Sequence, residues 1–109
     1  VGWILRSGGV AVLAHPLRYT LSGGGRRDLA REFSEAGGRG VEVATGGAST
    51  QQVSEAAGLA ARAGLDGSAG SDFHDPAIAW NPPGRLAKLP ASVRPVWAQP
   101  PFPRDFGRP

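Results

Sequence analysis

The sequence contains no cysteine, no methionine and no apolar run long enough to cross a membrane. Without cysteine there is no disulfide framework and no thiolate metal site, so any metal ion must be held by oxygen and nitrogen ligands. A membrane-spanning helix needs about 18 or more predominantly apolar residues, and the absence of such a run excludes a membrane-spanning helix in this sequence. The absence of cysteine is compatible with a reducing compartment, and we expect a cytoplasmic protein.

The absence of methionine also bears on the extent of the chain. None of the 109 residues is Met, and the first residue is Val1. We therefore expect this sequence to be a fragment or a processed piece of a longer protein.

Charge and proline are distributed unevenly along the sequence. Residues 1–84 carry seven basic and eight acidic side chains, whereas residues 85–109 carry five basic side chains and Asp105 alone. The net charge of +3 thus gives little support to nucleic-acid binding by the folded part. Eight of the ten prolines lie between Pro82 and Pro109. We predict a partial domain over residues 1–97 and a disordered, proline-rich basic tail over residues 98–109.

Strand and helix patterns alternate in the first 70 residues. Residues 1–6 have the character of a helix end, which the following glycines would stop. The continuous apolar run at residues 10–14 is typical of a strand buried on both faces of a parallel sheet. The next predicted elements are a helix at residues 26–36, a strand at 41–44, a helix at 49–63 and a strand at 65–70.

Two helices have specific signals. In the first, Leu29, Phe33 and Ala36 fall at i, i+4 and i+7, which predicts the buried face. In the second, Ser49 and Gln52 form a capping-box pattern. The last strand has poor propensity, and only the regular alternation of strand and helix predicts it.

This alternation predicts an α/β fold with parallel strands. Three strands and two complete helices are too few to close a barrel, which typically takes about 250 residues. We expect the chain to be one sector of such a fold. In parallel α/β folds, functional groups gather at the carboxyl ends of the strands.

Both histidines of the sequence lie where a predicted strand gives way to a loop. His15 follows the first strand, and Asp72 and His74 follow the third. In extended backbone, Asp72 and His74 would aim the same way while Phe73 turns back toward the packing. Imidazole and carboxylate suit a divalent ion that lowers the pKa of a bound water. On the same rim, the guanidinium of Arg18 is suited to a forked contact with a phosphate.

Each of these residues also has a purely structural interpretation. A single histidine after a strand is more often a hydrogen-bonding group than a ligand, and Arg18 could pair only with Asp75 or Glu42. Glu42 points opposite to Val41 and Val43. It therefore either faces the barrel interior and contacts the metal ligands, or it forms a plain salt bridge. The glycines at residues 23–25 form either a flexible connection or a loop that lets backbone amides approach a phosphate.

The motifs resemble those of the PHP-domain metal-dependent phosphoesterases. They are Ala-His-Pro-x-Arg-Tyr at residues 14–19, Gly-Val-Glu-Val at 40–43 and Gly-Ser-Asp-Phe-His at 70–74. The sequence is most similar to the bacterial branch called TrpH or YciV, whose characterised members are nucleoside 3',5'-bisphosphate phosphatases and 5'-to-3' RNA exonucleases. The resemblance covers residues 1–97 and corresponds to the C-terminal portion of the domain.

The resemblance implies a distorted (βα)7 barrel with up to three divalent ions, Mn²⁺ first and Fe²⁺ or Zn²⁺ as alternatives. It implies that His15, Asp72 and His74 are metal ligands, with no catalytic residue beyond them, and that Arg18 binds substrate. The family's first two motifs, a His-x-His with its Asp and a His and Glu cluster, have no counterpart in this sequence. We therefore expect activity only together with the missing N-terminal part.

Two classes of function remain open on the sequence. The first is a phosphoesterase acting on phosphorylated nucleotides or short RNA, with no membrane and no stable protein partner. The alternative is a non-catalytic, truncated or degenerate domain whose basic tail binds nucleic acid or another protein. The sequence does not exclude a histidinol-phosphate phosphatase or the PHP domain of a polymerase, but Arg18-Tyr19 and Trp80-Asn81 favour the TrpH branch.

Overall fold

The chain alternates helices and strands in the order that the sequence predicts. The computed structural model describes residues 1–77, 82–84 and 86–102. Its elements are α1 (Gly2–Arg6), β1 (Val12–Leu13), the 3-10 helix η1 (Pro16–Arg18), α2 (Gly23–Glu35), β2 (Gly40–Thr45), α3 (Thr50–Ala63), β3 (Asp66–Gly70) and the 3-10 helix η2 (Val96–Ala98).

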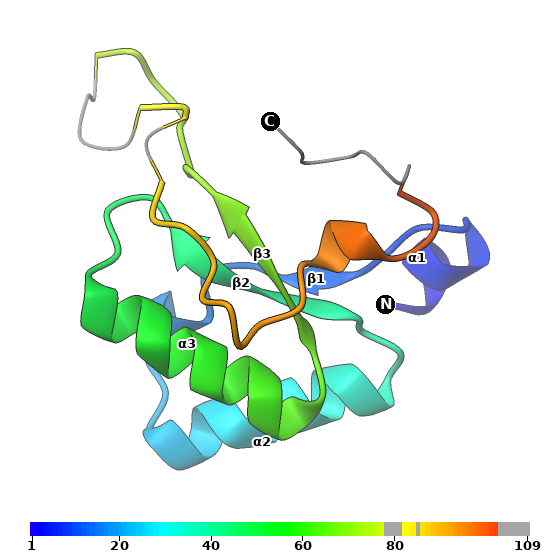
Figure 1. Ribbon diagram of the computed structural model, residues 1–109. Coiled ribbons are helices and arrows are strands. Elements are labelled where there is room, and N and C mark those ends of the chain that lie inside the picture. Colours follow the sequence, from blue (N-terminus) through cyan, green and yellow to red (C-terminus); the bar gives the residue numbers. More distant parts are fainter. Residues whose placement is uncertain (78–81, 85, 103–109) are drawn as a thin grey trace.

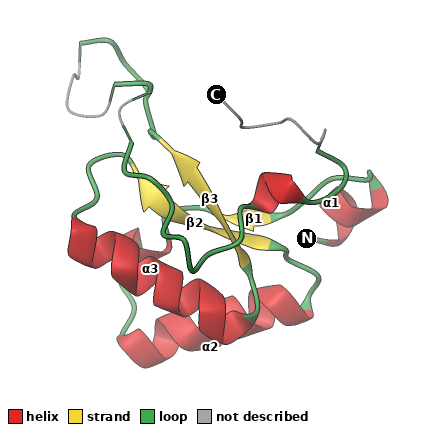
Figure 2. Ribbon diagram, in the orientation of Figure 1, coloured by secondary structure: helices red, strands yellow, loops and turns green. Residues whose placement is uncertain are grey.

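The strands form one parallel sheet in the order β1-β2-β3 (Figure 1). Helices α2 and α3 lie side by side against one face of this sheet (Figure 2). The predicted α/β class and the parallel pairing are therefore confirmed. Strand β3 forms despite its poor propensity, because its whole length pairs with β2. No helix in the described part of the chain is long and apolar enough to span a membrane.

The core lies between β2 and α3. Val41 and Val43 are buried on the helix-covered face of β2. The buried residues of α3 are Val53, Ala56, Ala57, Leu59 and Ala60. The small alanines let the helix approach the sheet closely, as predicted.

The predicted capping box begins α3. The Ser49 hydroxyl accepts a hydrogen bond from the backbone N–H of Gln52 at 3.1 Å, and the Gln52 side chain accepts one from the N–H of Ser49 at 2.9 Å. Gly64 ends the helix in the left-handed conformation, with φ of 67°. Both ends of α3 are thus fixed by local sequence.

The first strand differs from its prediction. It is only two residues long, and Val12 is 37% exposed, so the expected burial on both faces is wrong in the described part of the chain. Val12 shares a face with Gly40 and Val96. The helices cover the opposite face, which leaves this one largely open.

Helix α2 starts three residues earlier than predicted. Residues 23–25 form its first turn, and the Ser22 hydroxyl accepts a hydrogen bond from the N–H of Gly25 at 3.0 Å. The interpretation of these glycines as a loop is therefore wrong, because the Ser22 cap offsets their low helix propensity. The inward face also differs, since Ala30 is buried and Ala36 is exposed.

The segment at residues 93–98 packs against β3, as predicted for residues up to 97. Val93 and Val96 are buried, and the N–H of Gly67 donates to the carbonyl of Arg94 at 2.8 Å. Beyond it, the Arg39 guanidinium donates to the Gln99 side chain. The predicted tail lies from residue 103 outside the described residues, and its disorder stays a prediction.

We expect the 109-residue chain on its own to lack a cooperative thermal transition. Trp3 is 82% exposed, and Val12 on the open face of the sheet is 37% exposed. Amide NMR signals of the isolated chain should be poorly dispersed, whereas the full-length protein should melt cooperatively. A sharp melting transition with well-dispersed signals from the isolated chain would contradict this expectation.

Candidate functional site

The three strand ends meet at one edge of the sheet. His15 follows β1, Thr45 ends β2 and Gly70 ends β3. The N–H of Gly46 donates to the carbonyl of Gly70 at 2.9 Å, which joins the second end to the third. The predicted gathering of residues at the carboxyl edge is therefore present.

Strained backbone marks two of the predicted site residues. Among the described residues, His15 and Asp72 are the only non-glycine residues with positive φ, at 29° and 55°. Such conformations cost about 1–3 kcal/mol each and persist where surrounding contacts hold them. They cluster at functional sites, so the strain independently singles out these two positions.

The pKa of Asp72 is lowered by the groups around it. The Arg18 guanidinium donates a hydrogen bond to its carboxylate, and this bond lowers the pKa of Asp72 below its ordinary value. The charges of Arg18, His74 and His15 lower the pKa further, while desolvation opposes them. The carboxylate is thus ionised at neutral pH. The structural interpretation of Arg18 named Asp75 or Glu42 as its ion-pair partner. This is wrong, because Arg18 forms its ion pair with Asp72.

His74 lies beside Asp72, although not for the predicted reason. Its Nδ1 is 2.7 Å from the backbone oxygen of Asp72 and 3.7 Å from Oδ1. The extended backbone expected here is wrong, because β3 ends at Gly70 and Asp72 has positive φ. Phe73 accordingly does not turn into the packing and is 38% exposed. The side chain of His74 itself is 76% exposed.

His15 is held by contacts on several sides. Its backbone N–H donates to Oε1 of Glu42 at 3.0 Å, and the Tyr19 ring meets the imidazole edge-on at 5.8 Å. Its Nδ1 atom is buried and has no hydrogen-bond partner in the described part of the chain. A buried imidazole nitrogen without a partner, near an ionised carboxylate, fits the donor set of a divalent metal. No three His, Cys, Asp or Glu side chains among the described residues converge on one point.

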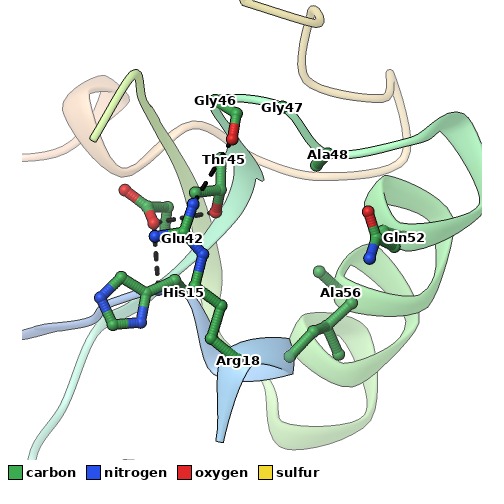
Figure 3. Close-up of a pocket in the computed structure, with 10 residues that line it drawn as sticks. His15, Arg18, Glu42, Thr45, Gly46, Gly47, Ala48, Gln52 and Ala56 are labelled. Atoms are coloured by element: carbon green, nitrogen blue, oxygen red, sulfur yellow. Dashed lines mark hydrogen bonds between the residues drawn. The ribbon is translucent and has the colours of Figure 1, made fainter. Parts of the chain in front are cut away.

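A cavity of about 160 Å³ opens beside this edge (Figure 3). Arg18 lies on its wall and donates from Nη2 to the carbonyl of Gly46 at 3.4 Å. The cavity is lined by His15, Leu17, Arg18, Glu42, Thr45, Gly46, Gly47, Ala48, Gln52 and Ala56. The sequence predictions gave no site role to Gln52 or to Tyr19. The only signal for Tyr19 is its position in the Ala-His-Pro-x-Arg-Tyr motif.

Fold and site together define an α/β protein with a polar site at the carboxyl edge of a parallel sheet. No family model matches the chain. Among curated proteins, it is 42% identical over 99 residues to a 3',5'-nucleoside bisphosphate phosphatase from Chromobacterium violaceum, covering 91% of this chain and 35% of that protein. It is 45% identical over 94 residues to the 5'-3' exoribonuclease Rnm from Escherichia coli, covering 86% and 32%.

The chain also matches a solved structure over most of its length. It is that of an amidohydrolase from Chromobacterium violaceum, described with bound sulfate and no metal, and it matches with a TM-score of 0.80 at 43% identity. The match covers 89% of this chain and 33% of that chain. The chain therefore spans about a third of the length of the proteins it matches. It is homologous to bacterial proteins named as nucleoside bisphosphate phosphatases and 5'-3' exoribonucleases, which confirms the relationship predicted from the motifs.

Proposed function

We propose that the full-length protein containing this chain is a metal-dependent phosphoesterase that hydrolyses phosphate esters of nucleotides or short RNA. The observation that carries the proposal is the gathering of His15, Asp72 and Arg18 at one sheet edge, with strained backbone at the first two. The homologous proteins, a phosphatase and exoribonucleases by name, support it.

The sheet is proposed to be one sector of a distorted (βα)7 barrel of the PHP type. Two features support this. The chain spans about a third of its relatives, and one face of its sheet lacks a covering layer in the described residues. In a closed barrel this face would point to the interior, and the carboxyl edge would form part of the rim.

His15, Asp72 and His74 are the proposed metal ligands of this sector. Bound divalent ions, Mn²⁺ or else Fe²⁺ or Zn²⁺, would supply a water of lowered pKa and neutralise charge on phosphate oxygens. The lowered pKa of Asp72 keeps a carboxylate available for this purpose at neutral pH. The further ligands would come from outside the described residues.

Arg18 is the proposed substrate-binding residue. Its guanidinium lies between the Asp72 carboxylate and the Gly46 carbonyl on the wall of the cavity. A planar fork of N–H donors matches two oxygens of a phosphate, which an ammonium group does not. A phosphate ester at this edge would thus meet Arg18 next to the ligand carboxylate.

Phosphate release from defined substrates tests the proposal. The full-length protein should release phosphate from a 3',5'-nucleoside bisphosphate or nucleotides from a 5'-monophosphorylated short RNA, and EDTA should stop either reaction. Comparing the two substrates separates the phosphatase from the exonuclease activity. A purified, metal-loaded protein that hydrolyses neither substrate would refute the proposed function.

We expect Arg18→Ala to raise KM for the phosphate ester about 10-fold or more, because a charge-assisted contact worth about 1.5–3 kcal/mol is lost. Arg18→Lys should recover little of this loss. KM is to be measured at saturating Mn²⁺, so that loss of the ion pair between Arg18 and Asp72 does not act through the metal content. Arg31→Ala is the matched control, because Arg31 lies exposed on α2 and its ion-pair partners among the described residues are Asp28 at 3.5 Å and Glu35 at 3.9 Å. Equal KM values for Arg18→Ala and the control would remove Arg18 from substrate binding.

The alternative function, a non-catalytic domain with a binding tail, depends on Arg104 and Arg108, which lie outside the described residues. No described feature favours it. A cytoplasmic location and the lack of a stable protein partner likewise stay predictions.

A further inference from the structure

Glu42 occupies an unusual place for a charged residue. It lies within β2, on the face opposite the buried Val41 and Val43, and is half-buried. A glutamate is unfavourable inside a short strand unless its carboxylate has partners. Its Oε1 accepts hydrogen bonds from the backbone N–H of His15 at 3.0 Å and from the Thr45 hydroxyl at 2.9 Å (Figure 3).

The third strand is shaped to admit this carboxylate. A Cβ atom on Gly70 would lie 2.7 Å from Oε2 of Glu42, which is closer than real Cβ contacts. Any side chain at position 70 would therefore displace the carboxylate. Glu42 thus contacts the segment after β1 through His15 and the end of β2 through Thr45, and it packs against the end of β3 at Gly70.

The bond to His15 bears directly on the candidate ligands. His15 has φ of 29°, a conformation that persists only when neighbouring contacts hold it. The side-chain oxygen of Glu42, which accepts from the His15 N–H at 3.0 Å, provides such a contact. Without it, the backbone of His15 would relax and the imidazole would change direction.

From these contacts we infer that Glu42 is a positioning residue, which holds His15 and the end of β3 in the geometry needed for metal binding without itself contacting ion or substrate. The inference rests on the proposed function. It assigns to Gly70 the role of leaving space for the Glu42 carboxylate.

Three substitutions in the full-length protein test the inference. Glu42→Gln keeps an oxygen that can accept both hydrogen bonds, Glu42→Ala removes it, and Gly70→Ala keeps Glu42 but displaces its carboxylate. Gly58→Ala in α3 is the matched glycine control, because a Cβ there meets nothing within 4 Å.

We expect Glu42→Ala and Gly70→Ala each to weaken Mn²⁺ binding about 10- to 100-fold, the range typical of groups that orient metal ligands. Glu42→Gln and Gly58→Ala should stay within about 3-fold of wild type, because the acceptor or the packing is unchanged. In the Glu42→Ala background, Gly70→Ala should cause little further loss, since both act through one carboxylate. At subsaturating Mn²⁺, kcat of each variant should fall in step with its weakened metal binding. KM for the phosphate ester, measured at saturating Mn²⁺, should stay unchanged.

A second readout depends neither on metal nor on turnover. With selective ¹⁵N-histidine labelling, the backbone amide signal of His15, identified by its loss in His15→Asn, should shift in Glu42→Ala and Gly70→Ala and stay in place in Glu42→Gln. If the wild-type protein binds Mn²⁺ but hydrolyses no phosphate ester, the proposed function fails while this readout still decides the role of Glu42.

Two results would overturn the inference. If Glu42→Gln loses as much Mn²⁺ as Glu42→Ala, the charge itself is required and Glu42 is a ligand. If Glu42→Ala leaves both the His15 amide signal and Mn²⁺ affinity unchanged, Glu42 has no positioning role. Should Glu42→Ala fail to fold, Gly70→Ala decides in the same way.

Discussion

Asp72→Asn in the full-length protein should reduce phosphate release by more than about 100-fold, because loss of a direct ligand should exceed the 10- to 100-fold effect of groups behind it. Asn is the informative replacement. It tolerates positive φ as Asp does, so the backbone at φ of 55° is preserved while the charge is removed. Elemental analysis of the purified variant should show fewer bound ions per chain than in wild type.

Asp75→Asn is the matched control for this substitution. Within the described part of the chain, the Asp75 carboxylate accepts a hydrogen bond from the backbone N–H of Ala77 at 2.9 Å, and an amide oxygen can replace it there. Its activity and metal content should equal those of wild type. His15→Asn, which also tolerates positive φ, and His74→Ala should lose metal and activity as Asp72→Asn does. Full metal occupancy in all three variants would show that the metal assignment is wrong.

The fold was predictable where local sequence signals agree with the regular alternation of strands and helices along the chain. The capping box at Ser49 and Gln52 and the glycine at position 64 fix both ends of α3, and the structure has both. The strand β3 carried no propensity signal of its own. It was predictable only because strands and helices alternate, which is a property of the whole chain rather than of its five residues.

Other features of the fold depend on tertiary contacts that no short pattern contains. The glycines at residues 23–25 are poor helix formers, yet the Ser22 cap draws them into α2. The apolar run containing Val12 has the composition of a strand covered on both sides, whereas the described residues leave Val12 37% exposed. Composition indicates what a strand can bury, and the neighbouring elements decide what it does bury.

The site was predictable as a list of residues more than as a geometry. The parallel topology alone places His15 and Asp72 at one edge, although they lie 57 positions apart in the sequence. The positive φ of Asp72 and its ion pair with Arg18 were not predictable, because both depend on how the segment after β3 turns. The role inferred for Glu42 likewise follows from atoms of three different strand ends.

Removal of divalent metal from the full-length protein should abolish phosphate release, and Mn²⁺ should restore it. Imidazole and carboxylate ligands bind first-row divalent ions, and a bound ion would supply hydroxide near neutral pH. Dialysis against EDTA, followed by titration with Mn²⁺, Fe²⁺ and Zn²⁺, would measure both the dependence and the preferred ion.

Magnesium and calcium provide the control for that experiment. Both prefer all-oxygen coordination, so they should restore little activity at a site that contains two histidines. Residual activity after complete chelation, or equal rescue by calcium, would show that imidazole does not ligate the working ion. His15 and His74 would then be hydrogen-bonding groups at strand ends, and the buried Nδ1 of His15 would need another partner.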